Sequence, residues 1–204
     1  MTIVLLIRHG NTDWNREGRT QGHLNNPLNR LGVKQATALA ERLSEEKWDI
    51  IVSSDLLRAR QTAEIISRHL GNQQVQYDDR LREIDRGQIA GSTERERIAK
   101  WGDNWSQLDL GQESLSSVRK RGTACINELV EKYSGQKILV VSHGLLLRET
   151  LKGLLNNEAT GTHLENTSVT TLEKNVNGWR YLSYNSISHL REEEYNYYGS
   201  TLDL

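Results

Sequence analysis

The sequence predicts a mostly parallel α/β fold, in which a central sheet carries helices on both faces in three α/β/α layers. Three observations lead to this fold class. Apolar runs rich in β-branched residues at 3–7, 50–52 and 138–141 are typical of strands that are covered on both faces. Apolar residues at helical spacing follow each run. No linker rich in Pro, Gly or Ser interrupts the 204 residues, so we expect a single domain, 1–204.

The first half of the chain alternates strand and helix twice. A strand at 3–7 stops at Arg8-His9-Gly10, and a second strand at 49–52 continues through Ser53-Ser54-Asp55. Asn29 suits the start of the first helix, because its side chain can accept a backbone N–H group of the first turn. We expect the apolar face of the first helix to contain Val33, Ala36, Ala40 and Leu43, and that of the second to contain Ala59, Ala63, Ile66 and Leu70.

An irregular stretch separates the two halves. Residues 84–113 show no persistent period, so we expect loops and short helices there. A lid-like insertion is predicted at 85–120, because long irregular connections often cover binding sites. From Ser114 a longer helix should run to a stop at Gly135, with a buried stripe of Leu115, Val118, Gly122, Ile126, Leu129 and Tyr133.

The remainder of the chain repeats the first pattern and then adds two strands. A strand at 137–142 ends in His143-Gly144, and a helix at 145–155 follows. Val169 to Leu172 suggest another strand, and Asn177-Gly178 is a tight-turn signal before a last strand at 179–184. The final residues, 191–204, are rich in Glu and Tyr and are expected to form a surface tail.

Composition excludes several classes of protein. Hydrophobic residues make up 36% and charged residues 26% of the chain, with a net charge of -1. These values argue against disorder and against a surface for polyanions, so no nucleic-acid partner is expected. The single cysteine, Cys125, excludes a disulfide framework and favours a reducing compartment. Because no signal-peptide pattern and no bilayer-spanning apolar run occur, we expect a cytoplasmic protein without a membrane partner, with a homodimer left open.

Three strand ends carry residues that suit an anion. Arg8 and His9 follow the first strand, and His143 follows the strand at 137–142. Arg58 lies in the first turn of the helix after the second strand. The carboxyl ends of parallel strands lie at one edge of a sheet, so these side chains are expected to share a crevice. Arginine presents paired donors that match phosphate oxygens, and a neutral imidazole beside arginines is a competent nucleophile near pH 7.

Two other interpretations of these histidines were weighed against the sequence. His9 and His143 could be structural residues at strand ends, although each precedes a glycine, which allows a ligand to approach the backbone closely. No metal is predicted, because no His-x-His or His-x-x-x-His pair occurs and Arg8 would repel a cation. No Gly-x-x-x-x-Gly-Lys and no Gly-x-Gly-x-x-Gly motif occurs, so no cofactor is predicted either.

Five sequence blocks follow one another along nearly the whole chain. They are Arg8-His9-Gly10-Asn11-Thr12-Asp13-Trp14-Asn15, then Gln21-Gly22 with Pro27-Leu28 and Leu31-Gly32, then Ser53-Ser54-Asp55-Leu56-Leu57-Arg58-Ala59-Arg60-Gln61-Thr62-Ala63, then Leu81-Arg82-Glu83-Ile84, and finally Ser142-His143-Gly144. In this order the blocks resemble the histidine phosphatase superfamily, whose fold is shared by cofactor-dependent phosphoglycerate mutases. The resemblance implies a phosphoglycerate mutase-like α/β fold and phosphoryl-transfer chemistry.

The resemblance also implies a role for each matching residue. His9 corresponds to the nucleophile that forms a phosphohistidine. Glu83 corresponds to the acid and base that protonates the leaving oxygen and then activates water, although composition alone would favour a loop carboxylate paired with Arg82 or Arg86. The other catalytic positions, which hold the phosphoryl group, are Arg8, Arg58 and His143. Further phosphate contacts are implied for Asn15, Gln21, Gly22 and Gly144.

Departures from the family pattern limit what can be expected of the substrate. Asn11 stands where glutamate is frequent, and 87–91 lacks the Trp and Glu that are common there. Asp85-Arg86 is similar to a branch with metal-independent phosphoserine phosphatases. The 85–120 segment is shorter than in phosphoglycerate mutases and lacks a clear counterpart of their arginine pair. We therefore predict a metal-independent phosphatase for a small phosphorylated metabolite, with a phosphoglycerate mutase, a phosphoserine phosphatase-type enzyme or a non-catalytic domain of this fold as alternatives.

Overall fold

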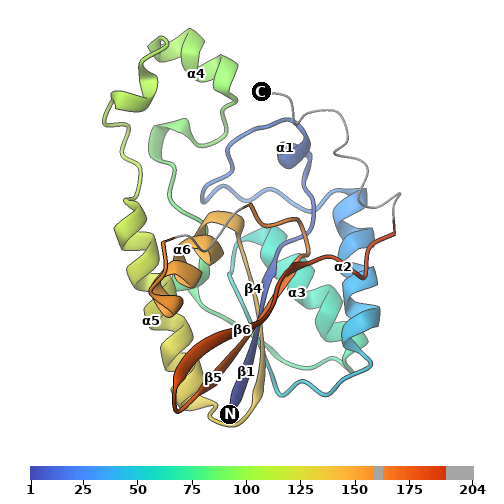
Figure 1. Ribbon diagram of the computed structural model, residues 1–204. Coiled ribbons are helices and arrows are strands. Elements are labelled where there is room, and N and C mark those ends of the chain that lie inside the picture. The colour runs from blue at the N-terminus through green and yellow to red at the C-terminus, as the bar shows by residue number, and fades with distance from the viewer. Residues whose placement is uncertain (159–162, 192–204) are drawn as a thin grey trace.

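The alternation of apolar runs and amphipathic segments produces a layered α/β structure, which confirms the predicted fold class (Figure 1). The computed structural model describes residues 1–158 and 163–191. Within them a six-stranded sheet has the order β3-β2-β4-β1-β5-β6. Strands β3, β2, β4 and β1 are parallel to one another, while β5 and β6 add antiparallel pairings at one edge. The strands are β1 (Thr2–Arg8), β2 (Ile50–Ser53), β3 (Val75–Tyr77), β4 (Lys137–Ser142), β5 (Val169–Asn175) and β6 (Gly178–Ser186).

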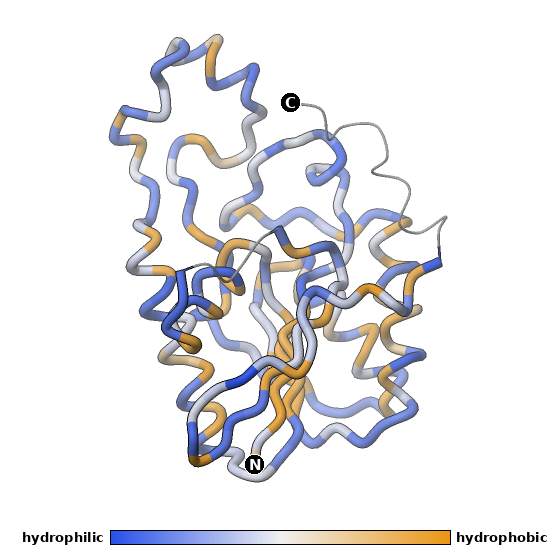
Figure 2. The backbone as a smooth tube through the Cα atoms, viewed as in Figure 1, coloured by the Kyte–Doolittle hydropathy of each residue, from blue (hydrophilic) through white to orange (hydrophobic). Residues whose placement is uncertain are grey.

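The central strands supply two cores, one on each face of the sheet. Val4 and Leu6 of β1 belong to one core and Leu5 and Ile7 to the other, because successive side chains of a strand point to opposite faces. Strand β4 divides in the same way. Figure 2 shows the hydrophobic colour running along these strands through the middle of the molecule. Both faces of the sheet therefore need a cover of helices.

Two pairs of helices provide that cover. Helices α2 (Arg30–Leu43) and α3 (Leu57–His69) pack on the face of Leu5 and Ile7. Helices α5 (Leu115–Lys132) and α6 (Gly144–Leu155) pack on the opposite face (Figure 1). Asn29 caps α2 as predicted, since its side-chain oxygen accepts the N–H of Gly32 at 2.8 Å.

Two residues that were expected on buried helix faces are exposed. Val33 is 45% exposed, because the buried stripe of α2 runs through Gly32 and Gln35 instead. The side-chain oxygen of Gln35 accepts the N–H of Asn11 at 3.0 Å, so the loop after β1 draws a polar residue inward. Leu115 is 47% exposed, because it opens α5 one turn before Val118, the first residue of that helix to reach the core.

The remaining elements are short. No sequence pattern predicts β3, α1 (Asp13–Arg16) or η1 (Asp79–Leu81), because three or four residues show no period. Residues 84–113 contain η2 (Gly87–Ile89), α4 (Glu94–Trp101) and η3 (Trp105–Gln107), in keeping with the loops and short helices expected there. Figure 1 places α4 at the top of the molecule, beyond the layers. Among the described helices, none combines the length and apolar composition needed to cross a bilayer. The predicted tail, apart from Arg191, lies outside the described residues.

Candidate active site

The ends of β1, β2 and β4 meet at one edge of the sheet. Arg8 and Ser142, the last residues of β1 and β4, are paired in register, and the N–H of His9 donates to the carbonyl of Ser142 at 2.9 Å. The N–H of Ser54 donates to the carbonyl of Val141 at 2.9 Å, which brings the end of β2 to the same place. The sheet register therefore gathers the three strand ends that the sequence predicted would share a crevice.

His9 presents an unprotonated ring nitrogen. Its side chain is only 3% exposed, and Nδ1 lies 2.7 Å from the carbonyl oxygen of Gly10. That contact requires a proton on Nδ1, so the lone pair resides on Nε2, where Nε of Arg58 donates to it at 3.3 Å. Burial, followed by the charges of Arg58 and Arg8, holds the pKa of His9 well below its usual 6.5. His9 is therefore a neutral imidazole near pH 7.

Arg58 is a buried cation held by carbonyl groups. It is 1% exposed, and its Nη atoms donate to the carbonyls of Gly22 at 2.9 Å and Leu24 at 3.0 Å and to Oδ1 of Asn26 at 3.3 Å. Burial lowers its pKa to about 10, which still leaves it charged at neutral pH. Within residues 1–158 and 163–191 it forms no ion pair with a carboxylate. The charge of Glu83 acts on Arg58 from a distance, but no carboxylate contacts it in the described residues, so an anion that binds beside this buried cation is favoured.

His143 and Arg8 complete the cationic edge. The His143 ring is fully buried, and its centroid lies 5.2 Å from that of His9. Its Nε2 lies 2.8 Å from Oγ of Ser54, while its Nδ1 has no hydrogen-bond partner in the described part of the chain. Burial and then the charge of Arg58 lower the pKa of His143 well below 6.5. Arg8 donates to the carbonyl of Leu164, and a Cβ on Gly144 would lie only 3.4 Å from its Nε.

Glu83 reaches the site from the other side. Its carboxylate accepts the N–H groups of Leu145 at 3.2 Å and Leu146 at 3.0 Å, so it lies over the start of α6, next to His143. A carboxylate at a helix N-terminus is held by those N–H groups and by the helix dipole. The loop-carboxylate interpretation is wrong for Arg82, whose partner is Asp55. Arg86 likewise forms no ion pair with Glu83 among the described contacts.

The predicted side chains line two adjoining cavities. The first, of about 160 Å³, is lined by Arg8, His9, Asn15, Arg19, Thr20, Gln21, Gly22, Arg58, Glu83 and Arg86. The second, of about 190 Å³, is lined by Arg8, Glu83, Gly144, Leu145, Arg148, His163 and Leu164. Arg8 and Glu83 belong to both, so the cavities share a border. His143 lies behind His9 and lines neither of them.

Asn15 and Gln21 use much of their polar capacity within the loop after β1. Oδ1 of Asn15 accepts from the N–H of Thr12 at 3.1 Å in a capping box at α1. Nε2 of Gln21 donates to Oγ1 of Thr12 at 2.9 Å, and its Oε1 accepts from Asn26 at 2.9 Å. Gly22 has φ +52, and its carbonyl orients Arg58. These residues form the part of the cavity wall that surrounds His9 and Glu83.

The sequence did not identify Arg19, Arg86, Arg148 or His163 as site residues. Arg19 is bound to both carboxylate oxygens of Glu96, at 2.6 and 2.9 Å. His163 lies 3.3 Å from Nη1 of Arg8, although more than 150 residues separate them in sequence. Only Arg86 had a signal, in the Asp85-Arg86 pair that the resemblance drew attention to. No group of three potential metal ligands occurs among the described residues, and arginines dominate the first cavity.

Comparisons with known proteins agree with this geometry. Residues 4–187 match the family model described as the histidine phosphatase superfamily (branch 1). The uncharacterized phosphatase PhoE of Bacillus subtilis (strain 168) is 35% identical over 192 residues, covering 93% of this chain and 97% of PhoE. The metal-independent phosphoserine phosphatase of Arabidopsis thaliana is 34% identical, covering 93% of this chain and 84% of that protein. A histidine-to-alanine mutant of Entamoeba histolytica phosphoserine phosphatase, solved with phosphoserine, superposes with a TM-score of 0.80 at 31% identity, covering 94% of this chain and all of that one.

Proposed function

The chain belongs to the histidine phosphatase superfamily and is a phosphoric monoester hydrolase, and we propose that it acts by transferring the phosphoryl group of a small metabolite to Nε2 of His9. The observation that carries this mechanism is the contact between that nitrogen and Arg58, a buried guanidinium without a carboxylate partner in the described residues. The phosphate ester supplies the missing negative charge, and the neutral imidazole supplies the attacking lone pair.

Two steps then account for hydrolysis. In the first, Nε2 of His9 bonds to phosphorus, the bond from phosphorus to the ester oxygen breaks, and protonated Glu83 gives its proton to that oxygen. In the second, Glu83 takes a proton from water, the water oxygen bonds to phosphorus, and the bond from phosphorus to Nε2 breaks. His9 and Glu83 are thereby restored to their starting forms, and inorganic phosphate leaves.

Charge on the transferred group is stabilised by Arg8, Arg58 and His143. A guanidinium that acts on the phosphoryl group contributes roughly 10³ to 10⁵ in rate in related phosphoryl transfers. The carbonyl groups of Gly22 and Leu24 hold the Arg58 guanidinium in place before substrate binds, so little reorganisation is needed. Nδ1 of His143 has no hydrogen-bond partner among the described residues, which supports a role for it in donating to a phosphoryl oxygen once it carries the ring proton.

The first cavity supports a small substrate with a second anionic group. A volume of about 160 Å³ is below the roughly 300 Å³ at which pockets for drug-sized ligands begin. Arg86 lines this cavity, and in the described part of the chain its side chain donates one hydrogen bond of 3.4 Å, to the neutral amide of Gln112. Its neighbours Arg19 and Arg82 each have a carboxylate partner. Phosphoserine, the ligand of the Entamoeba relative, carries such a second anion.

Location and net reaction complete the proposal. Cys125 is buried and free, which agrees with a reducing cytoplasm. We propose net hydrolysis over isomerisation, because the 85–120 segment is shorter than in phosphoglycerate mutases and lacks a clear counterpart of their arginine pair. Assaying 3-phosphoglycerate for 2-phosphoglycerate formed against phosphate released separates a phosphatase from a mutase.

The direct test removes the nucleophile. His9→Ala should abolish turnover of p-nitrophenyl phosphate, while EDTA should leave the wild-type rate unchanged. His69→Ala is the matched control, because His69 lies on α3 outside both cavities and its Nδ1 is 3.0 Å from the carbonyl of Ile65 in its own helix. Retained activity in His9→Ala, or loss of wild-type activity with the chelator, would refute the proposal.

A further inference from the structure

Glu83 lies in a segment that has no regular secondary structure of its own. Residues 83–86 belong to no helix or strand, and they connect η1 to η2. His9, Arg58 and His143 lie in or directly beside a strand or helix, whose backbone hydrogen bonds fix their position. Within the described residues Glu83 has no such neighbouring hydrogen-bond ladder. The position of its backbone must therefore depend on contacts from elsewhere in the chain.

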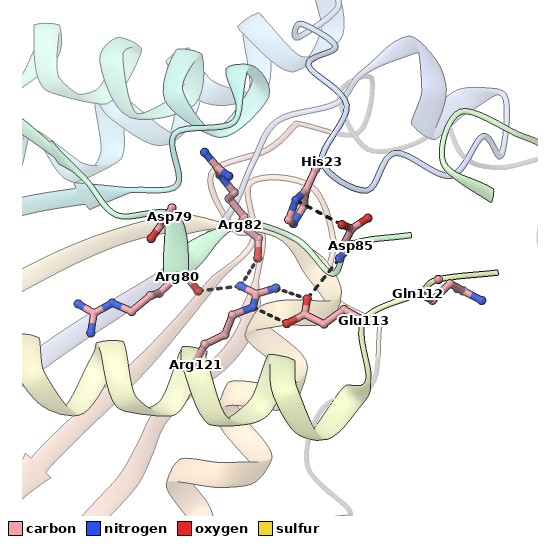
Figure 3. A pocket seen from close by; sticks show the side chains of 9 residues that line it. His23, Asp79, Arg80, Arg82, Asp85, Gln112, Glu113 and Arg121 are labelled. Carbon is pink, nitrogen blue, oxygen red and sulfur yellow. Dashed lines mark hydrogen bonds and ion pairs between the residues drawn. The ribbon is translucent and has the colours of Figure 1, made fainter. Parts of the chain in front are cut away.

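One guanidinium supplies most of those contacts. Arg121, on α5, donates through Nη1 to the carbonyls of Arg80 at 2.7 Å and Arg82 at 2.6 Å, and through Nη2 to the carbonyl of Glu83 at 3.0 Å. Figure 3 shows this side chain reaching from the helix to the oxygens of the segment above it. The carbonyl of Glu83 also lies 2.8 Å from Nε2 of His23. The residue that carries the proposed acid is thus held by two side chains at its backbone.

Glu113 orients the guanidinium and extends the same network. It accepts from Nε and Nη2 of Arg121, both at 2.9 Å. Two more hydrogen bonds join Glu113 to Asp85. The Glu113 carboxylate accepts the N–H of Asp85 at 3.3 Å (Figure 3). The N–H of Glu113 donates to the carbonyl of Asp85 at 2.9 Å. Arg121 and Glu113 therefore fix the backbone on both sides of Glu83, while the carboxylate end is fixed separately by α6.

We propose that Arg121, oriented by Glu113, is a positioning residue that sets the place of the Glu83 carboxyl group relative to the leaving oxygen. Arg121 does not line either of the two cavities, so its contact with the reacting groups is indirect, through the Glu83 segment and through the effect of its charge on His143. This inference rests on the proposed role of Glu83. A displacement of about 1 Å in a catalytic group can cost on the order of 100-fold in rate, which is the scale to expect here.

The leaving group separates positioning from general structural support. An alkyl phosphate such as phosphoserine needs its leaving oxygen protonated, whereas the nitrophenolate of p-nitrophenyl phosphate leaves readily without a proton. Arg121→Lys keeps a positive charge near His143 but removes the planar fork of donors. In single-turnover experiments we expect it to lower the rate of enzyme phosphorylation by phosphoserine roughly 10- to 100-fold and that by p-nitrophenyl phosphate less than about 3-fold, because the later hydrolysis step needs Glu83 for both substrates.

Three further variants make the experiment decisive. Arg119→Lys is the matched control on the same helix, because Arg119 pairs with Glu149 and Glu158 and does not touch the Glu83 segment. Glu113→Gln carries the same prediction as Arg121→Lys and replaces it if that variant does not fold. Glu83→Gln removes the acid itself, so its loss of rate on phosphoserine relative to p-nitrophenyl phosphate sets the largest difference to expect.

Each outcome decides the matter. Selective loss on phosphoserine in Arg121→Lys or Glu113→Gln, with Arg119→Lys unaffected, supports the inference. Equal loss on both substrates, or no loss, overturns it while leaving the role of Glu83 intact. Absence of discrimination in Glu83→Gln itself overturns the proposed acid, and the inference with it.

Discussion

The nucleophile pocket and the Glu83 segment are built in different ways. His9, Arg58 and His143 lie at strand ends and helix starts, where sheet register and helix geometry place them. Glu83 lies in an irregular segment whose backbone is held by side chains from α5 and from the loop after β1. In the proposed mechanism, the regular part supplies the chemistry common to phosphoryl transfer, namely attack and charge neutralisation. The irregular part is proposed to supply proton transfer and the selection of substrate.

The largest effect should come from the regular part. Arg58→Lys keeps a positive charge but cannot match its four acceptors, so we expect kcat to fall roughly 10³-fold for alkyl and aryl phosphates alike. Steady-state kinetics on both substrate types checks this. Arg60→Lys is on the same helix, where Arg60 pairs with Glu64 and lies over the ring of Tyr77 outside the first cavity, and should behave as wild type. A loss confined to alkyl phosphates would break the division between the two regions.

The irregular part should show a smaller effect that depends on the substrate. Glu83→Gln keeps the shape of the side chain but removes the transferable proton, so we expect a loss of on the order of 10² on phosphoserine in single-turnover phosphorylation experiments. The burst of nitrophenolate from p-nitrophenyl phosphate should change little in the same variant. An equal loss in both burst phases would mean that Glu83 supports the fold of the pocket rather than proton transfer.

Arg86 tests substrate selection within the same segment. Arg86→Gln should raise KM about tenfold or more for phosphoserine, because a hydrogen bond between charged groups is lost, and should leave KM unchanged for a phosphate ester without a second charge. KM measurements on the two esters check the prediction. Arg95→Gln, an exposed residue of α4 outside the cavity, serves as the control. If both esters bind more weakly by the same factor, Arg86 contacts the phosphoryl group itself.

The buried histidines should have a modest effect on stability. Burial and neighbouring arginines depress the pKa of His9 and His143 in the folded protein, while the unfolded chain binds protons with a pKa near the usual 6.5. The unfolded state therefore binds more protons below that pH, and the free energy of unfolding should decrease as the pH falls below about 6.5. Urea denaturation between about pH 5 and pH 7.5 measures the slope. His9→Gln should reduce it, and an unchanged slope would mean that His9 is protonated in the fold.

Sequence reasoning succeeded where local pattern decides structure. The run at 3–7 and the cap at Asn29 are set by neighbouring residues, so strand and helix were predicted together with the strand ends that carry His9 and His143. Strand β3 was not predicted, because its three residues owe their pairing to β2. Helical spacing with Ala36 predicts a buried Val33, but a hydrogen bond to a distant loop draws Gln35 inward instead.

In the site, too, local sequence pattern predicts some residues, while others depend on contacts between distant parts of the chain. Within the described residues Arg86 has no ion pair with a carboxylate, unlike Arg19 and Arg82, and such pairing depends on residues that only the fold brings together. Arg121 and Glu113 lie about thirty residues or more after Glu83 in sequence and meet it only through the packing of α5. The resemblance to a family identified Glu83, but neither composition nor periodicity indicated what holds it in place.

The central claim is that the phosphoryl group passes through Nε2 of His9. Glu83→Gln treated with p-nitrophenyl phosphate should accumulate the intermediate, because formation needs no acid for this leaving group while hydrolysis needs the missing base. Peptide mass spectrometry after rapid quenching should find one phosphoryl group, labile to acid, on His9. A phosphoryl group on another residue such as Ser54, or turnover without any phosphorylated enzyme, would contradict the account.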